Sequence, residues 1–205
     1  MKVSVINCGY GNIGSVMNML KKIGVDAEIC VESTNIKNST HIILPGVGSF
    51  DRGMKKLKDR GFYDAIQNDV KKFQIPFLGI CLGMQFLFKH SDEGTSYGLD
   101  LIPGKLEKFD LKETGSDLKV PHMGWNYVNF SDSSKLGKGL KENSRFYFVH
   151  SYCYKNTKSI YCKGFTDYGE NFTSVIENEN FFGVQFHPEK SLNFGIKLFK
   201  NFLKC

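Results

Sequence analysis

Apolar positions in the first ninety residues alternate between short continuous runs and helical spacing. Short apolar runs, which predict buried strands, occupy residues 2–7, 25–31, 41–49 and 75–80. Apolar residues recur every three or four positions at 12–23 and at 51–73, which predicts helices, the second interrupted at Gly61. Residues 81–90 are also predicted to be helical. Strands that alternate with helices favour an α/β fold with a parallel sheet.

The second half of the chain is richer in residues that favour strands. Strand-like segments separated by short turns are GKLEKFDL (104–111), WNYVNF (125–130), RFYFVHSYCY (145–154), SIYCKGFT (159–166), FTSVIEN (172–178) and FFGVQF (181–186). They predict an antiparallel extension or hairpins, followed by a C-terminal helix at about 191–204. Since no repeat or low-complexity linker divides the chain, residues 1–205 are expected to form a single domain.

A glycine pattern follows the first predicted strand. Gly9, Gly11 and Gly14 form G-x-G-x-x-G, and Glu32 lies a short distance beyond the helix that follows. This pattern is typical of a dinucleotide-binding turn, so a dinucleotide-binding oxidoreductase is one interpretation of the chain. The same glycines also suit a tight strand-to-helix turn in which Asn12 caps the helix.

A cysteine lies between two glycines in FLGICLGMQF. Gly79, Cys81 and Gly83 form G-x-C-x-G where a predicted strand meets a predicted helix. In such a turn the cysteine projects at the carboxyl edge of a parallel sheet, beside a helix N-terminus that favours the thiolate. Free backbone N–H groups there can stabilise an oxyanion. Cys81 is therefore a candidate nucleophile, although this stretch alone also fits a buried structural cysteine.

A thiol nucleophile needs a base, and His187 is the best placed of the five histidines, at the end of the strand FGVQF. Glu189 lies two positions further on, near enough to orient the imidazole, which predicts a Cys-His-Glu triad. The loop LPGVGSF at 44–50 follows another buried strand and predicts an oxyanion donor facing Cys81. Taken alone, H-P-E also fits a solvated loop histidine, and the glycine loop also fits a plain strand-to-helix turn.

Composition and charge exclude several classes of function. The net charge is +6, but the lysines are spread along the chain, which argues against nucleic-acid binding. No segment approaches the ~20 apolar residues of a membrane span, and the N-terminal apolar run is too short for a signal peptide, so a cytoplasmic protein without membrane contact is expected. The six cysteines show no C-x-x-C pair and no zinc spacing, so we expect no metal or other cofactor.

Two further histidine-containing stretches are less decisive. VPHMGWN, at 120–126, places the only tryptophan, Trp125, near His122 and Met123, which fits either core packing or an interface hot spot. His150 lies in FYFVHSYCY, a predicted strand with aromatic residues at alternate positions. We interpret it as a core or turn histidine rather than as a catalyst.

Five motifs resemble those of the class I glutamine amidotransferases, and they occur in the same order. They are LPGVGSF, GICLGMQ, PHMGWN, YFVHSY and GVQFHPEKS. In detail they look like the glutaminase subunits of imidazole glycerol phosphate synthase, over nearly the whole chain. The resemblance implies a flavodoxin-like α/β fold whose central, mostly parallel sheet has flanking helices and an antiparallel extension. It also implies that Cys81 attacks the side-chain amide of L-glutamine, His187 shuttles protons and Glu189 orients His187.

The resemblance implies roles for residues around the triad. Backbone N–H groups of the oxyanion hole are implied at Val47, Gly48 and Leu82. Substrate-binding residues are implied at Gly46, Gln85, Glu93, Ser151 and Tyr152. Residues at an interface with a partner are implied at Asn12, Met123 and Trp125. One departure is Ser49, where some relatives carry larger residues.

The implied partner is a (β/α)8-barrel cyclase subunit, with which the chain would form a heterodimer. The cyclase would receive the ammonia and form imidazole glycerol phosphate in histidine biosynthesis. A paralogue that feeds ammonia to another synthase, such as a surface-sugar amidation enzyme, remains an alternative because its glutaminase half looks alike. A non-catalytic partner-binding subunit is a second alternative, against which the intact triad argues. The dinucleotide interpretation is disfavoured, since it has no use for a cysteine elbow and an H-P-E segment at one sheet edge.

Overall fold

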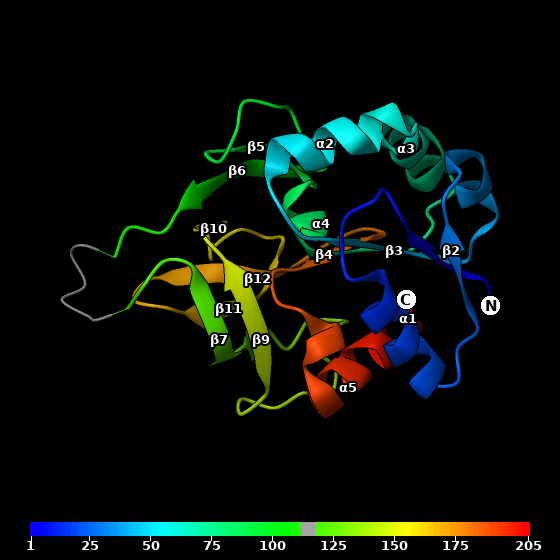
Figure 1. The fold of residues 1–205 in the computed structure, drawn as a ribbon. Helices are drawn as coiled ribbons and strands as arrows, with labels where there is room; N and C mark the ends of the chain where they lie inside the picture. The colour runs from blue at the N-terminus through cyan, green and yellow to red at the C-terminus, as the bar shows by residue number, and fades with distance from the viewer. Residues whose placement is uncertain (112–117) are drawn as a thin grey trace.

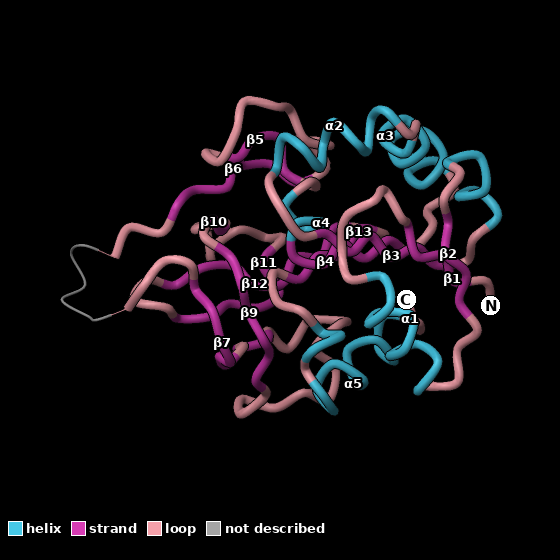
Figure 2. Tube along the Cα trace, in the orientation of Figure 1, coloured by secondary structure: helices cyan, strands magenta, loops and turns pink. Residues whose placement is uncertain are grey.

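A sheet of eight strands forms the middle of the molecule. The computed structural model describes residues 1–111 and 118–205 (Figures 1 and 2). The strands of this sheet are β1 (Val3–Ile6), β2 (Ala27–Cys30), β3 (His41–Gly46), β4 (Phe77–Cys81), β8 (Asn129–Phe130), β11 (Cys162–Asp167), β12 (Asn171–Asn178) and β13 (Phe181–Val184). Their order across the sheet is β2-β1-β3-β4-β13-β12-β11-β8.

The sheet is parallel on one side and antiparallel on the other. Strands β2, β1, β3, β4 and β13 all pair in parallel, whereas β12, β11 and β8 continue as antiparallel neighbours. This confirms the predicted α/β fold, including its antiparallel extension. Because the parallel strands share a direction, the segments that follow β1, β3, β4 and β13 all lie at one edge.

Helices cover both faces of the parallel part. They are α1 (Ile13–Lys22), α2 (Phe50–Asp59), α3 (Phe62–Ala65), α4 (Leu82–Gln85) and α5 (Leu192–Phe202). In Figure 1, α2 and α3 lie on one side of the sheet, and α1 and α5 lie on the other. Each side has its own apolar core, one containing Phe50 and Met54 of α2 and the other containing Leu20 of α1 and Phe199 of α5. Short helical segments are η1 (Ser33–Asn38), η2 (Ile66–Val70) and η3 (Pro188–Lys190).

Two smaller sheets lie beside the carboxyl edge of the main one. The first is an antiparallel pair, β7 (His122–Tyr127) with β9 (Arg145–His150). The second contains β5 (Phe88–Ser91), β6 (Ile102–Lys108) and β10 (Tyr152–Cys153). A single bridge between Tyr147 and His187 joins β9 to the segment that leaves β13. The smaller sheets therefore form walls around the edge where the parallel strands end.

The predicted helix at 81–90 is wrong over most of its length. Helix α4 makes one turn, and β5 begins at Phe88. The reason lies in long-range backbone pairing: the Phe86 carbonyl accepts from Leu99 N–H, and the Leu87 carbonyl accepts from Ile102 N–H. These carbonyls would otherwise bond further along a helix. The predicted interruption at Gly61 is confirmed, with φ 71°.

The N-terminal glycine turn has the geometry of a structural turn. A Cβ on Gly11 would lie 2.8 Å from the Pro45 carbonyl oxygen, so this glycine lets the turn approach the end of β3 closely. A Cβ on Gly14 would meet nothing within 4 Å. The third glycine of a dinucleotide fingerprint serves close helix–sheet packing, and Gly14 has no such contact. Asn12 caps α1 as predicted, because its Oδ1 accepts from Ser15 N at 3.2 Å.

Two glycine substitutions test how closely the cysteine turn packs on the sheet. A Cβ on Gly83 would lie 1.9 Å from the Leu44 carbonyl oxygen, so Gly83→Ala is expected to lower the free energy of unfolding by about 3 kcal/mol. The matched control Gly14→Ala adds a methyl group in open space within a helix. It is expected to raise the free energy of unfolding by about 0.5–1 kcal/mol. Urea denaturation measures both. Equal stability of the two variants would contradict the close packing.

Candidate active site

Cys81 lies in a strained turn between β4 and α4. Its backbone has φ 53° and ψ −110°, a conformation that side chains other than glycine rarely adopt. The flanking glycines allow this turn, since a Cβ on Gly79 would lie 2.4 Å from the Gly83 carbonyl oxygen. The turn has the strand-to-helix form of a nucleophile elbow. Cys81 is 6% exposed, so its sulfur faces a pocket rather than open solvent.

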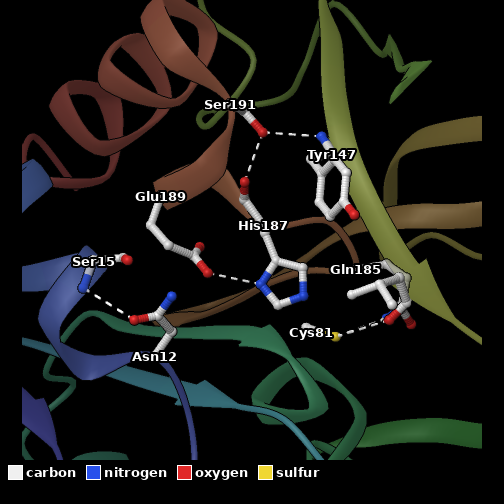
Figure 3. A network of polar contacts seen from close by, with 9 residues as sticks. Asn12, Ser15, Cys81, Tyr147, Gln185, His187, Glu189 and Ser191 are labelled. Carbon is white, nitrogen blue, oxygen red and sulfur yellow. Dashed lines mark hydrogen bonds and ion pairs between the residues drawn. The ribbon is translucent and has the colours of Figure 1, made fainter. Parts of the chain in front are cut away.

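His187 and Glu189 form a buried pair next to this cysteine. Glu189 Oε1 lies 2.7 Å from His187 Nδ1, and both side chains are at most 2% exposed. Figure 3 shows Glu189 and Cys81 on opposite sides of the imidazole, with Nε2 on the side of the sulfur. Among the described residues, Nε2 has no hydrogen-bond partner. The structure thus brings together all three predicted triad residues, with Nε2 directed toward the sulfur.

The charges around His187 decide its protonation. Burial lowers its pKa, but attraction to the Cys81 thiolate and the Glu189 carboxylate outweighs burial and raises the pKa to about 10. His187 is therefore an imidazolium at neutral pH when Cys81 is a thiolate. An imidazolium beside a thiolate is the usual state of a cysteine nucleophile paired with histidine.

The backbone around His187 is fixed by β9 and by Ser191. His187 N–H donates to the Tyr147 carbonyl at 2.8 Å. Ser191 Oγ donates to the His187 carbonyl at 2.6 Å and accepts from Tyr147 N–H at 3.0 Å (Figure 3). These bonds make the imidazole position depend on the β7–β9 sheet.

Gln185 contacts the nucleophile and was not predicted from the sequence. Its Nε2 lies 3.8 Å from Cys81 Sγ, and its Oε1 accepts from Gln85 Nε2 at 3.2 Å. The side chain is fully buried. Gln185 lies just after β13, but the sequence held a signal for it: it is two residues before His187 at the end of the predicted strand FFGVQF, and residues two apart in a strand point to the same side.

A pocket of about 250 Å³ opens above Cys81. Seven of the residues implied for the oxyanion hole and for substrate binding line it: Val47, Gly48, Leu82, Gln85, Glu93, Ser151 and Tyr152. Pro121, Val149 and His150 also line it. Gly46 lies behind this lining, where a Cβ would be 2.8 Å from Gly83 N, so it keeps the β3 loop close to the elbow.

The loop after β3 and the first turn of α4 line the pocket beside Cys81. Val47 is 44% exposed, and Gly48 has φ 109°, which favours glycine. Leu82 is the first residue of α4, where N–H groups have no partner within the helix. The residues implied for the oxyanion hole thus lie beside Cys81 at the ends of two neighbouring strands.

Glu93 is held at the pocket by the start of α2. Its Oε2 accepts from Phe50 N at 2.9 Å. Asp51 fixes the same loop, because its carboxylate accepts from Thr95 N at 3.1 Å and from Ser96 N at 2.9 Å. Burial, together with the charge of Asp51, raises the pKa of Glu93, and the Phe50 bond opposes this. Glu93 supplies a carboxylate at the mouth of the pocket.

The three residues implied at a partner interface lie outside the pocket. Met123 and Trp125 are 61% and 45% exposed on the outer face of β7. The Trp125 ring lies beside Arg145 and Tyr147, with centroid distances of 5.8 and 6.3 Å. Asn12 is exposed at the start of α1, on the side of the triad where Glu189 lies (Figure 3).

Residues 1–111 and 118–205 contain neither a cluster of metal-ligating side chains nor a membrane-spanning helix. No group of three or more histidine, cysteine, aspartate or glutamate residues there is placed to hold a metal ion. No helix in the same ranges is long and apolar enough to cross a bilayer. All six cysteines are free.

Known proteins resemble the chain in sequence over almost its whole length. The family model described as glutamine amidotransferase class-I matches residues 4–205. Imidazole glycerol phosphate synthase subunit HisH 2 of Methanococcus maripaludis is 49% identical over 205 residues, covering 98% of both chains. HisH of Leptospira interrogans is 42% identical over 200 residues, and HisH 2 of Pseudomonas aeruginosa is 43% identical over 204, each covering 98% of both chains.

Solved structures agree with the fold. A protein described as glutamine amidotransferase matches with a TM-score of 0.72 at 18% identity, covering 98% of this chain and 97% of its own. PurLQS from Thermotoga maritima matches with a TM-score of 0.70 at 17% identity, covering 99% of this chain and 97% of its own. By its sequence, its fold and its curated relatives, the chain belongs to the class-I glutamine amidotransferase family and groups there with the HisH subunits.

Proposed function

We propose that this chain is the glutaminase subunit of an imidazole glycerol phosphate synthase. It hydrolyses L-glutamine to glutamate and passes the ammonia to a (β/α)8-barrel cyclase subunit in histidine biosynthesis. The observation that carries this proposal is the pairing of Cys81 with His187 and Glu189 below a pocket of about 250 Å³. The names of the HisH relatives support the choice of synthase.

The first half of the reaction forms a thioester. The Cys81 thiolate attacks the side-chain amide carbon of glutamine, and the carbonyl oxygen becomes an oxyanion. Backbone N–H groups of Leu82 and of Val47 or Gly48 bind this oxyanion. His187 donates its Nε2 proton to the departing nitrogen, so that the carbon–nitrogen bond breaks, ammonia leaves and a glutamyl thioester remains.

The second half regenerates the enzyme. Neutral His187 takes a proton from water through Nε2, and the resulting hydroxide attacks the thioester carbon. Collapse of this intermediate releases glutamate and the Cys81 thiolate, with His187 again protonated. Throughout, Glu189 accepts the Nδ1 hydrogen bond and keeps Nε2 directed at the reacting atoms.

The pocket walls fit the two charged ends of glutamine. Glu93 offers a carboxylate to the α-ammonium group. The main chain of Ser151 and Tyr152 faces the α-carboxylate, and Gln85 lies between these walls. The residues implied by the resemblance therefore act on opposite ends of one amino acid.

The cyclase binds over the exposed face that carries Met123 and Trp125, with Asn12 at its margin. Exposed aromatic residues beside arginine are typical of interface hot spots. One glutaminase domain over residues 1–205 forms a heterodimer with one barrel. The continuous sheet, in which β13 pairs with β4, supports this single-domain proposal.

A glutaminase of the same fold that serves another synthase is a second candidate. Two of the three relatives above carry the number 2 in their names, which favours considering a paralogue. Purification from the native source separates the two proposals. Recovery of a cyclase barrel supports the histidine pathway, and recovery of a different synthase supports the alternative.

Replacing the nucleophile tests the chemistry. Cys81→Ala is expected to abolish glutamine-dependent turnover of the complex, because no thioester can form. Ammonia-dependent turnover by the partner is expected to stay near the wild-type rate, since the partner needs ammonia only. Steady-state assays with each nitrogen source measure both. Retained glutamine turnover would rule out Cys81 as the nucleophile.

Replacing the orienting acid tests the triad. Glu189→Gln removes a charge that raises the pKa of His187, so the pH above which the imidazolium is lost moves down. Glutamine-dependent kcat is expected to fall by about 10²- to 10³-fold. The pH dependence of Cys81 alkylation reports the shift. An unchanged pH profile would contradict the role of Glu189.

The glycine loop after β3 leads us to expect that the partner controls glutaminase activity. Val47 lies between two glycines, so its peptide can turn over at modest energetic cost. We expect the purified chain alone to be nearly inactive as a glutaminase, and addition of the partner with its nucleotide substrate to activate it. Glutamate release with and without the partner measures this. Full activity of the chain alone would overturn the prediction.

A further inference from the structure

Two buried histidines lie next to the pocket and take no part in the reaction above. His122 on β7 and His150 on β9 are directly opposite each other in the antiparallel pair. They are 2% and 6% exposed, and His122 Nδ1 lies 3.1 Å from His150 Nε2. His150 also lines the pocket.

The partners of the two rings fix where each proton lies. His150 Nδ1 lies 2.9 Å from the Tyr152 carbonyl oxygen, which can only accept, so Nδ1 donates. In a neutral ring Nε2 then accepts, and His122 Nδ1 must be its donor. His122 Nε2 in turn accepts from Asn126 Nδ2 at 3.3 Å. Asn126 Nδ2 also donates to the Asp167 carbonyl at 2.8 Å, which fixes the orientation of its amide.

Aromatic rings surround the pair and keep both histidines neutral. His122 stacks between Phe148 and Tyr168, with centroid distances of 4.6 and 3.9 Å. His150 contacts Phe172 at 5.1 Å. Burial lowers the pKa of His122 to about 4 and that of His150 to about 3. Both rings therefore stay neutral at physiological pH, and the same atoms donate and accept along the hydrogen-bond chain.

The chain of hydrogen bonds ends on the wall that faces the substrate carboxylate. The Tyr152 carbonyl accepts from His150 and from Gln85 Nε2, and the Ser151 carbonyl accepts from Phe109 N at 3.2 Å. A peptide is planar and trans, so each N–H points opposite to the carbonyl of the same peptide unit. The Phe109 bond therefore fixes the direction of Tyr152 N–H, and the His150 bond fixes the peptide that follows Tyr152, so that both peptides flanking the Tyr152 Cα are held.

We propose that His122 and His150 are positioning residues for glutamine, which hold the main chain of Ser151 and Tyr152 in the orientation that receives the α-carboxylate. This inference rests on the proposed glutaminase function and assigns a role to residues outside the triad. Neither histidine touches the substrate in this proposal. Their loss should weaken recognition of the carboxylate and leave the reactivity of Cys81 nearly unchanged.

Two reagents separate recognition from reactivity. The glutamine analogue 6-diazo-5-oxo-L-norleucine carries the α-amino and α-carboxylate groups and alkylates a nucleophilic cysteine, whereas iodoacetamide lacks both groups. The full chain, with its copurified partner bound, is treated with each reagent. Mass spectrometry of Cys81 yields the rate of alkylation, and the dependence on analogue concentration separates KI from kinact.

Three variants and a control define the expected outcome. His150→Leu is expected to raise KI about 10-fold or more, with kinact and the iodoacetamide rate within about 3-fold of the wild type. His150→Asn keeps a donor near the Nδ1 position and is expected to restore KI to within about 3-fold. His122→Phe removes only the second member of the pair and is expected to give a smaller rise. His41→Leu changes a buried histidine at the opposite edge of the sheet and should leave KI unchanged.

Other outcomes overturn the proposal in distinguishable ways. A wild-type KI in both His150→Leu and His122→Phe shows that the pair does not position the carboxylate wall. A parallel loss of iodoacetamide reactivity assigns the pair to general folding. If His150→Leu does not fold, His122→Phe and ¹⁵N NMR of the wild type decide, since a proton on Nε2 of either ring contradicts the chain. Absence of Cys81 labelling by the analogue in the wild type overturns the proposed glutaminase function instead.

Discussion

The close approach of strand β3 to the turn after Cys81, at the carboxyl edge of the sheet, determines the rest of the site. Leu44 and Gly46 of β3 touch the turn after Cys81, and a single methyl group on Gly83 would collide with the Leu44 carbonyl. This contact holds the nucleophile in its strained turn and keeps the β3 loop beside the first N–H groups of α4. The end of β3 and the cysteine turn thus form one closely packed unit at the base of the pocket.

Burial gives the small set of charges near Cys81 a large effect. His187 and Glu189 are almost completely shielded from water, so the attractions of the imidazolium to the Cys81 thiolate and to the Glu189 carboxylate are weakly screened and together overcome its desolvation. Burial lowers the pKa of His122 and His150 as well, and because neither has a carboxylate partner within the described part of the chain, both stay neutral. One region of the fold therefore contains charged and neutral histidines, each with a distinct task.

Local patterns in the sequence predict most of this arrangement, and its long-range pairings limit the prediction. The strand-and-turn signals around Cys81 and His187 locate the triad because parallel strands end at one edge. The extent of α4 could not be predicted, since the carbonyls of Phe86 and Leu87 pair with a segment more than ten residues away. Gln185, just after β13, was missed because a glutamine there carries no catalytic pattern, although it lies only two residues before His187. The His122–His150 pairing depends on the register of β7 with β9, which neither strand specifies alone.

Strand β7 carries the two proposed kinds of recognition, of the partner and of the substrate, on alternate side chains. Met123 and Trp125 face outward, while His122 faces inward to its pairing with His150. Outward positions can therefore diverge to suit a new partner without disturbing the inner ones, so a duplicated gene can change the protein it assists while its substrate stays the same. Insertion or deletion of one residue in this strand exchanges the two faces and removes both kinds of recognition at once. Adaptation of such a protein to new partners is thus expected to proceed by substitution, with the length of β7 held constant.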